Sequence, residues 1–294
     1  MSPLLFSLFV EDLESFLKQD VNNGINIDDL VLVLLLFADD MAIVGKTPLE
    51  IQNQLDRLLE YCNEWGLSVN TTKTKIMVFR KRGGLLPTER WTYNSQPIDV
   101  VNEFNYLGTV LSYTGNFGPN IEHVVSKSLK SLNVLLCKCN DYDLTPKTLC
   151  QLFDAFVLPI LNYSSEVWGY TKSKELERIH LKFCKRLLRV RINTCTAAVY
   201  GELGRYPLYI QRYVKLIKYW FRIMDSDNVI LRSMYNAALN DCNKGRTNWV
   251  SNIKQLLFEY EFPQVFVNPH SVDVKMFILE FKLKLVNCFK HKWL

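Results

Sequence analysis

The fold of this chain depends on one apolar stretch that two carboxylates interrupt, Leu30-Val31-Leu32-Val33-Leu34-Leu35-Leu36-Phe37-Ala38-Asp39-Asp40-Met41-Ala42-Ile43-Val44. Both arms have strand length and an apolar composition, which predicts a β-hairpin with Asp39 and Asp40 at its tip. The first arm, Leu30 to Phe37, is apolar on both faces, so we expect it to be buried on both sides. Adjacent strand residues point to opposite faces, so the two aspartates can share one site only on the turn.

Two carboxylates at such a tip have two interpretations. Carboxylates avoid apolar surroundings unless they are paired or bind metal. Their oxygens suit hard cations such as Mg²⁺ or Mn²⁺. The alternative is a solvated turn, in which Asp is common for conformational reasons. The two aspartates by themselves favour the solvated turn. The sequence around them favours a metal site instead.

From the start of the chain to about residue 117, the sequence shows both helical and strand patterns. The helical period over 2–17 predicts one helix, and a polar turn is expected over 21–29. Thr47, Pro48 and Glu50 predict the capped start of a further helix that ends at Gly66. Short strands are expected over 67–70, 75–79, 91–93, 98–101 and 106–113.

After Pro119 the pattern is helical almost throughout. The expected helices are 120–138, 146–158, 173–190, 195–203, 207–225, 228–240, 247–259 and 272–291. The fold class is therefore α+β, with a mixed part that contains a helix, a hairpin, a second helix and a small sheet, followed by an all-helical part.

Charge is distributed unevenly along the chain. Residues 1–60 contain eleven acids and three bases, whereas residues 171–222 contain thirteen bases and three acids. An acidic front favours a cation site, and a basic middle favours a polyanionic partner such as a nucleic acid. The alternative is that both are merely solvated helix faces.

One predicted helix in the basic block has two distinct faces. Basic residues recur near helical spacing and are candidates for phosphate contacts: Arg178, Lys182, Lys185, Arg186 and Arg189. Apolar residues form the opposite face: Leu176, Ile179, Phe183 and Leu187. An aromatic set follows that could stack on bases, although helix packing is favoured for it: Tyr206, Tyr209, Tyr213, Tyr219, Trp220 and Phe221.

Composition and targeting signals exclude several classes of protein. With 48% hydrophobic and 22% charged residues, the chain is neither a disordered tail nor a fibrous repeat. The longest apolar run, Leu30 to Ala38, is too short to span a bilayer as a helix, and no secretory signal is visible. We therefore expect an intracellular protein, nuclear or cytoplasmic, without a membrane partner. The eight cysteines are expected to be reduced thiols.

The segment Phe37-Ala38-Asp39-Asp40 between two strands resembles the third palm motif of reverse transcriptases from non-LTR (LINE-type) retrotransposons. Further segments match that family in order. Residues Ser2 to Phe6 resemble the palm motif that precedes the third one, and Leu67 to Phe79 resemble the palm motif that follows it. Residues Phe104 to Gly108 resemble the primer-grip hairpin. Four later segments resemble the helical region that follows the palm in that family: Leu161-Asn162-Tyr163, Glu166-Val167-Trp168, Glu202-Leu203-Gly204 and Pro207. The resemblance implies a partial palm over 1–117, a thumb-like region over 118–225 and a C-terminal helical region over 226–294.

The resemblance also implies a chemistry, namely two-metal phosphoryl transfer on an RNA template and a DNA primer. Asp39 would be the principal metal ligand, with Asp40 beside it and Phe37 near the primer end. Lys73 would lie near the outgoing phosphates, where a cation helps; the alternative is an exposed turn lysine. The primer backbone would be gripped by Tyr106, Leu107 and Gly108, together with Thr109, and core packing of Tyr106 and Leu107 is compatible with that role.

In that family an earlier palm motif supplies another catalytic aspartate, and a fingers region contacts the template. Both would precede Met1, so we expect little or no polymerase activity from this chain alone. Asp29 cannot substitute, because ten extended residues place it roughly 33 Å from Asp39. Two alternatives stay open. One is a nonenzymatic nucleic-acid-binding protein that uses the basic residues 171–222, and the other is a helical interaction protein in which Asp39-Asp40 is a bare turn.

Overall fold

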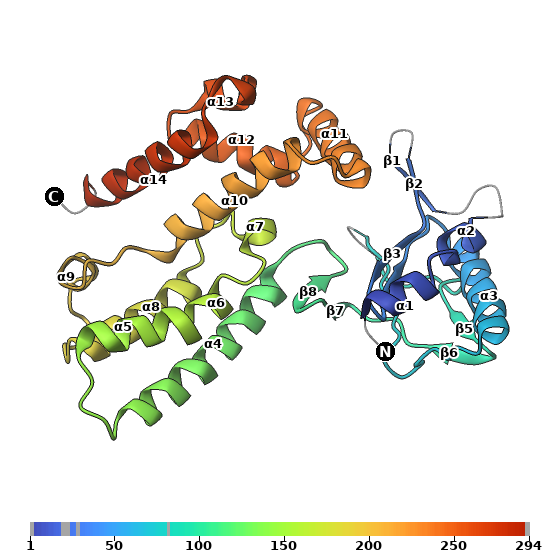
Figure 1. Cartoon of the computed structure of the whole chain (residues 1–294), viewed down its shortest axis with the longest axis horizontal. Helices are drawn as coiled ribbons and strands as arrows, with labels where there is room; N and C mark the ends of the chain where they lie inside the picture. Colours follow the sequence, from blue (N-terminus) through green and yellow to red (C-terminus); the bar gives the residue numbers. More distant parts are fainter. Residues whose placement is uncertain (1–2, 19–23, 28–29, 81–82, 292–294) are drawn as a thin grey trace. The chain divides into compact units, whose positions relative to one another are not determined.

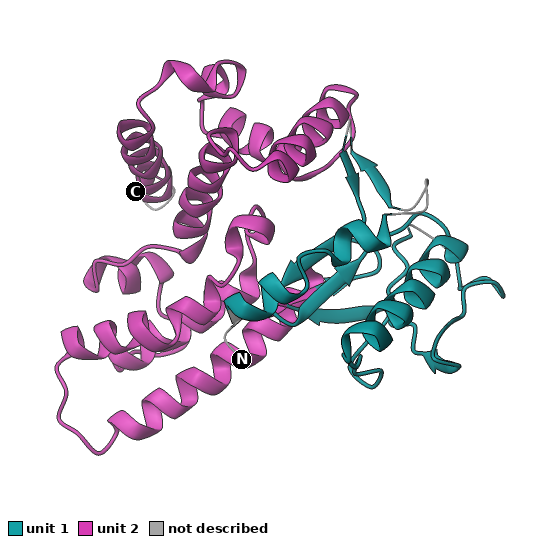
Figure 2. Cartoon of the chain, turned by 45° about the vertical axis from the view of Figure 1, so that its right-hand side comes forward, with its two compact units in different colours: residues 1–106, 111–116 teal, residues 107–110, 117–294 magenta. Residues whose placement is uncertain are grey.

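A computed structural model describes residues 3–18, 24–27, 30–80 and 83–291 (Figure 1). The chain forms two compact units, one of residues 1–106 and 111–116 and the other of residues 107–110 and 117–294 (Figure 2). The first unit mixes helices with small antiparallel sheets, and the second is almost entirely helical. The predicted α+β class is confirmed at this level. The labels palm and thumb remain predictions.

The first unit opens with two short helices, α1 (Pro3–Phe9) and α2 (Leu13–Leu17). The prediction of one helix over 2–17 is wrong in its described part, because the chain turns between them. The N–H of Leu13 donates to the carbonyl of Val10 (3.2 Å), which closes a tight turn and ends the regular helical ladder. The turn lets Leu13 and Leu17 enter the core, and it brings Asp12 to the Tyr61 hydroxyl, which donates to its carboxylate (2.6 Å).

The apolar arm before the aspartates forms two strands. β2 (Leu30–Leu32) pairs with β1 (Ile25–Ile27), and β3 (Leu34–Phe37) pairs with β4 (Asp40–Ile43). The prediction of one continuous strand over 30–37 is therefore wrong, because the arm changes partners at Val33. The predicted polar turn over 21–29 lies partly outside the described residues, and its residues 25–27 form β1 instead.

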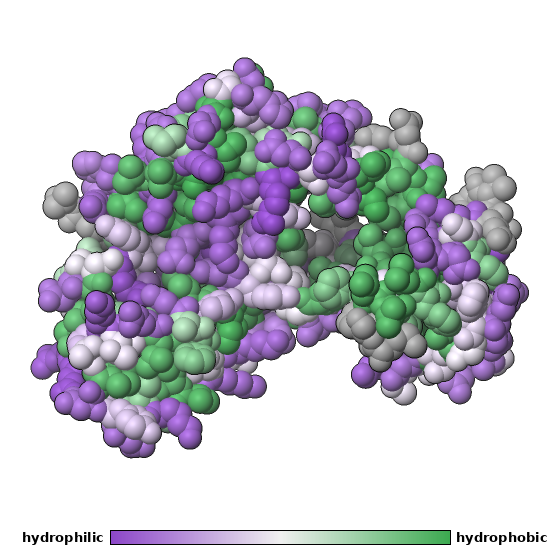
Figure 3. Space-filling view, viewed as in Figure 1, coloured by the Kyte–Doolittle hydropathy of each residue, from purple (hydrophilic) through white to green (hydrophobic). Residues whose placement is uncertain are grey.

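Burial of this arm on both sides was also a wrong prediction. Val33 and Leu34 lie in the core, but Leu35, Leu36 and Phe37 are exposed. Adjacent strand residues point to opposite faces, so the exposure of Leu35, Leu36 and Phe37 shows that both faces of the hairpin become open towards its tip. Hydrophobic surface gathers over α1 and the neighbouring strands of this unit (Figure 3).

Helix α3 (Pro48–Trp65) has both predicted ends. The Thr47 hydroxyl accepts from the N–H of Glu50 (3.2 Å), and Gly66 takes the left-handed conformation (φ 65°) that ends the helix. The Glu50 carboxylate accepts from the N–H of Lys46 (2.9 Å), so the predicted reciprocal bond to Thr47 is replaced by one to the preceding residue. Leu55 and Leu58 pack on Val33 and Leu34 in one apolar cluster.

Two more two-stranded sheets follow along the chain: β5 (Trp91–Tyr93) with β6 (Gln96–Ile98), and β7 (Glu103–Tyr106) with β8 (Thr109–Ser112). The strand predicted over 98–101 is thus shifted to 96–98, and the strand predicted over 106–113 is the second half of a hairpin. The strands predicted over 67–70 and 75–79 are wrong. Segment 75–79 makes a single parallel bridge, Ile76 to Val100.

Asn70 explains why the Thr-Lys-Thr-Lys segment is a turn and not part of a ladder. Its side-chain oxygen accepts from the N–H of Lys73 (3.1 Å) and from the hydroxyl of Thr72 (2.7 Å), and its carbonyl accepts from the N–H of Thr74 (2.9 Å). Local side-chain bonds of this kind compete with strand pairing.

Eight helices of the second unit match the predicted segments, with ends shifted by a few residues: α4 (Gly118–Cys139), α5 (Pro146–Phe156), α8 (Lys174–Leu187), α9 (Thr196–Glu202), α10 (Leu208–Met224), α11 (Val229–Asn243), α12 (Trp249–Glu259) and α14 (Val274–His291). The short helices α6 (Leu158–Leu161), α7 (Ser165–Trp168) and α13 (Pro263–Val267) and the 3₁₀ turn Pro269–Ser271 were missed. Elements of three to five residues are too short to show a helical period.

Helix α10 links the two apolar cores of this unit. Its first residue, Leu208, packs with Phe153 and Phe183, whereas Trp220 and its neighbours pack with α12 and α14. Of the predicted aromatic set, Tyr213, Trp220 and Phe221 are buried in helix packing, whereas Tyr206, Tyr209 and Tyr219 are half-buried. No helix in the described part of the chain is long and apolar enough to cross a membrane.

Candidate metal and nucleic-acid site

The hairpin β3–β4 places the two carboxylates at its tip, as the sequence predicts. Phe37 pairs with Asp40, so Ala38 and Asp39 form a two-residue loop, in which Ala38 has φ 53°. Asp39 lies on the turn and Asp40 is the first residue of β4. Both side chains are exposed, so their oxygens are open to a cation without a prior change of structure.

The negative charge of Asp40 acts on a residue of the predicted primer grip. Tyr106, the last residue of β7, is half-buried, and its pKa is raised first by burial and then by the negative charge of Asp40. The phenol therefore stays protonated at neutral pH and remains a hydrogen-bond donor.

Lys73 lies in the Asn70 turn with its side chain exposed. It makes no ion pair with any described residue, and no interaction within the described part of the chain joins it to the aspartates. Lys75, two residues later, pairs with Asp99 (2.5 Å). The placement of Lys73 near outgoing phosphates therefore stays a prediction.

The donors at the hairpin tip are two carboxylates. Among the described residues, no group of three or more His, Cys, Asp or Glu side chains could hold a metal ion. Asp29 falls outside the described residues. Exposed carboxylate oxygens fit a hard divalent cation, but they are fewer than the six ligands such a cation takes, so water, phosphate or other groups would have to complete the shell. All eight cysteines are free thiols, as predicted.

The basic residues of α8 lie on its outer face. Arg178, Lys182 and Arg186 are exposed on the helix and Arg189 is exposed just after it, while Lys185 is half-buried and donates to the carbonyl of Ile192. The opposite face is buried through Leu176, Ile179 and Phe183, with Leu187 half-buried. The helix is therefore amphipathic in the predicted sense, and contact of its basic face with nucleic acid remains a prediction.

Two basic residues of the block 171–222 are internal. Arg212 has no exposed surface and pairs with Glu177 (3.1 Å). Arg205 pairs with Asp154, and its Nε donates to His180 Nε2 (2.9 Å). A count of basic residues in the sequence does not distinguish such internal residues from exposed ones. The exposed positive charge of residues 171–222 is therefore smaller than the count indicates.

Sequence reasoning missed the side chains that hold the second hairpin. The Tyr163 hydroxyl donates to the carbonyl of Leu107 (2.9 Å), and the Asn120 side chain accepts from the N–H of Val110 (3.0 Å). Tyr163 belongs to a motif that the sequence singles out, but spacing alone does not show which turn it reaches.

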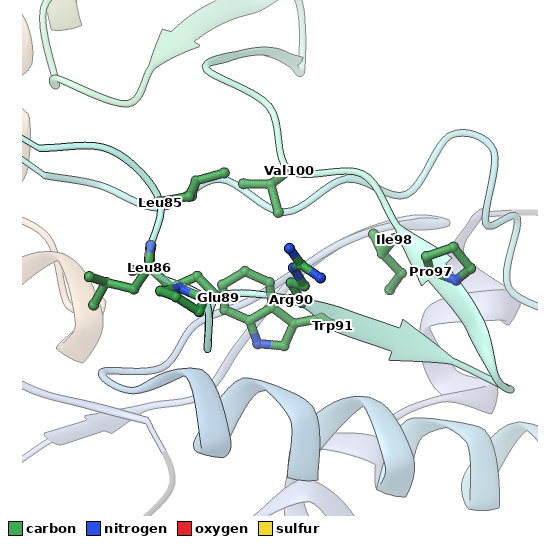
Figure 4. A pocket seen from close by; sticks show the side chains of 9 residues that line it. Leu85, Leu86, Glu89, Arg90, Trp91, Pro97, Ile98 and Val100 are labelled. Atoms are coloured by element: carbon green, nitrogen blue, oxygen red, sulfur yellow. The ribbon is translucent and has the colours of Figure 1, made fainter.

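A cavity of about 490 Å³ in the first unit lies away from these residues (Figure 4). Leu85, Leu86, Trp91 and Ile98 line its apolar part. Glu89, which pairs with Arg80 (2.7 Å), lies at the same place. None of the predicted site residues lines this cavity.

Comparisons with known proteins show similarity to a known family in the first part of the chain. Residues 1–111 match the family described as reverse transcriptase (RNA-dependent DNA polymerase). A transposon-derived protein of Caenorhabditis elegans is 30% identical over 168 residues, which cover 55% of this chain and 58% of that protein. The RNA-directed DNA polymerase from the mobile element jockey of Drosophila funebris is 24% identical over 199 residues, 65% of this chain and 21% of that enzyme.

A third relative is a retrovirus-related Pol polyprotein from a type-1 retrotransposable element of Popillia japonica, 22% identical over 211 residues, 69% of this chain and 34% of that polyprotein. The chain thus spans less than two thirds of the length of these relatives. The segment that matches the reverse-transcriptase family, residues 1–111, includes the Asp39-Asp40 hairpin. The mobile-element relatives place this segment with the LINE-type enzymes, so the resemblance seen in the sequence is confirmed.

Proposed function

We propose that this chain is the part of an RNA-directed DNA polymerase that holds divalent metal and contacts the primer–template. The observation that supports it is the hairpin β3–β4, which carries exposed Asp39 and Asp40 at its tip inside the segment that matches reverse transcriptases. Asp39 and Asp40 are the proposed ligands of Mg²⁺ or Mn²⁺. Bound divalent cations supply activation of the primer 3′-hydroxyl and neutralisation of phosphate charge in this class of reaction.

The residues around the tip have complementary proposed roles. Phe37 pairs with Asp40 and is 64% exposed, so its ring is free to contact the base or sugar at the primer end. Tyr106, whose pKa is raised by burial and by the charge of Asp40, keeps its proton and can donate to a phosphate. Lys73, exposed on its turn, would attract the outgoing phosphates.

We propose further that the metal site is incomplete in this chain alone. Two cations need more ligands than two carboxylates provide. The remaining ligands would come from groups other than these two carboxylates. Little or no primer extension is therefore expected from these residues by themselves.

The test combines binding with primer extension on one substrate, a DNA primer annealed to an RNA template. We expect the chain to bind this duplex in Mg²⁺ or Mn²⁺ and to extend the primer little or not at all. The variants are Asp39→Ala and a control, Asp56→Ala, an exposed carboxylate on α3. Absence of binding to the duplex contradicts the proposed function. Robust extension that Asp39→Ala abolishes supports the role of the hairpin and contradicts the incompleteness of the site.

The outer face of α8 supports a second candidate, a nonenzymatic nucleic-acid-binding protein. Its exposed cations are spaced by a helical turn, as a contact with a phosphate backbone requires. Removing Lys182 and Arg186 together should lower the slope of log affinity against log salt by about two. This second candidate is favoured over the polymerase if removal of Lys182 and Arg186 abolishes nucleic-acid binding while Asp39→Ala changes neither metal binding nor primer extension. A flat salt slope in the wild type contradicts phosphate contact.

A further inference from the structure

The turn between β7 and β8 has an unusual backbone. Leu107 has φ 47° and Gly108 has φ 79°, so both central residues adopt left-handed conformations. Glycine does this readily, but a leucine rarely does, and a short turn with a non-glycine residue there needs support from its surroundings. Residues 107–110 belong to the helical unit, although the strand before them belongs to the first unit (Figure 2).

Two side chains of the helical unit provide this support. The Tyr163 hydroxyl donates to the carbonyl of Leu107 (2.9 Å). A Cβ atom placed on Gly108 would lie 3.0 Å from the Tyr163 ring, so the ring lies directly against the glycine. On the other side of the turn, the buried Asn120 accepts from the N–H of Val110 (3.0 Å).

Tyr163 is itself fixed through its backbone. The indole N–H of Trp168, a buried residue, donates to the carbonyl of Tyr163 (2.9 Å). Lys215 on α10 donates to the carbonyl of the preceding Asn162 (3.2 Å). The ring of Tyr163 remains 50% exposed, so it holds the turn from the surface and is not simply a core side chain.

We propose that Tyr163 is a positioning residue that sets the Leu107–Gly108 turn for contact with the end of the primer. This inference rests on the proposed function, because it takes the β7–β8 hairpin as the element that contacts the primer. A turn held by one phenol hydrogen bond keeps its backbone groups in one orientation, so a ligand that binds there does not have to order them first. Removing the hydroxyl should therefore weaken recognition of a primer end without removing general affinity for duplex.

The test compares two RNA–DNA hybrids of equal length, one with a recessed DNA 3′ end and one blunt. We expect the wild type to prefer the recessed hybrid, and Tyr163→Phe to lose about fivefold of that preference, the loss of one hydrogen bond, with unchanged affinity for the blunt hybrid. The midpoint of thermal unfolding should fall by no more than about 4 °C, the effect of one lost hydrogen bond. The matched control is Tyr142→Phe, an exposed tyrosine between α4 and α5.

A second variant tests the contact between Tyr163 and Gly108 by changing the glycine. Gly108→Ala places a methyl group against the Tyr163 ring and strains the turn, so it should reduce the preference at least as much. Three results overturn the proposal. If Tyr163→Phe and Gly108→Ala both keep the wild-type preference, the positioning role is refuted and the proposed function survives. If Tyr163→Phe weakens binding of both hybrids equally and lowers the unfolding midpoint by more than about 4 °C, its role is structural. A wild type without any preference overturns the primer contact itself.

Discussion

Arg212 is a guanidinium with no exposed surface in the middle of a helical unit. The Glu177 carboxylate explains how it is tolerated. That carboxylate accepts from Arg212 Nη2 (3.1 Å) and from the N–H groups of Leu208 and Tyr209 (2.8 Å each) at the start of α10. One side chain thus neutralises a buried cation and caps the helix that links both apolar cores of the unit.

Glu177→Gln should therefore destabilise the helical unit strongly. It leaves a buried positive charge without a counter-charge, and breaking such a pair costs about 3 kcal/mol or more of the free energy of unfolding. Denaturant unfolding measures this loss. The control is Glu259→Gln, which removes an exposed pair with Lys172 and should cost at most about 1 kcal/mol. Equal effects of the two variants would contradict the role of Glu177.

His180 gives the helical unit a dependence on pH. Burial, followed by the positive charges of Arg205 and Arg212, lowers the pKa of His180 from 6.5 to about 3. In the unfolded chain His180 is therefore protonated below about pH 6.5, whereas in the folded chain it is protonated only near pH 3. The stability that the neutral imidazole contributes is complete above pH 6.5 and is lost as the pH falls through this window.

We expect the free energy of unfolding to fall by up to about 1.4 kcal/mol per pH unit below pH 6 because of this one group. His180→Gln should lower stability at pH 7.5 but flatten this slope. His270→Gln, which changes an exposed histidine, should leave the slope as in the wild type. Denaturant titrations at several pH values decide the point, and an unchanged slope in His180→Gln would refute the assignment.

At the scale of single elements, the sequence was most informative where its signals are local. The start of α3 depends on Thr47 and Pro48 and its end on Gly66, which are neighbours in the chain. The helices of the second unit likewise follow from apolar residues one turn apart. The strands depend on partners far away, so the division of 30–37 at Val33 and the loss of strands over 67–79 could not be read from local pattern.

Thr47→Ala should destabilise the first unit by about 1 kcal/mol, because it leaves the N–H of Glu50 without its capping oxygen. The conservative variant Thr47→Ser keeps that oxygen and should stay within about 0.5 kcal/mol of the wild type. The measurement is the urea midpoint of each variant. A Ser variant as unstable as the Ala variant would show that the cap does not act through the hydroxyl group.

At the scale of the whole molecule, the apolar clusters do not mix residues of the two units. The cluster around Leu58 contains only residues before Glu103, and those around Phe153 and Trp220 contain only residues after Asn116. Each unit thus has its own core, the condition for independent folding units.

Core truncations should therefore act on one unit at a time. Leu58→Ala and Phe153→Ala should each cost about 3 kcal/mol through the cavity they leave. Hydrogen exchange read by mass spectrometry should show faster exchange in the first unit for Leu58→Ala and in the helical unit for Phe153→Ala. Loss of protection throughout the chain in both variants would contradict separate cores.

The candidate site was predictable only in part. The hairpin and its exposed carboxylates followed from two aspartates between apolar arms, and the outer face of α8 followed from helical spacing. The effect of the Asp40 charge on Tyr106 and the contact of Tyr163 with Leu107 join segments more than fifty residues apart. No spacing rule predicts such contacts, because they depend on how whole elements pack.

The central claim is that Asp39 and Asp40 bind a divalent cation together, and a Mn²⁺ titration followed by electron paramagnetic resonance tests it most directly. The account predicts that Asp39→Asn and Asp40→Asn each weaken Mn²⁺ binding at least about tenfold, because each removes a charged oxygen ligand. Asp56→Asn, the control on α3, should bind as the wild type does. Mn²⁺ binding that is unchanged in both hairpin variants would contradict the account.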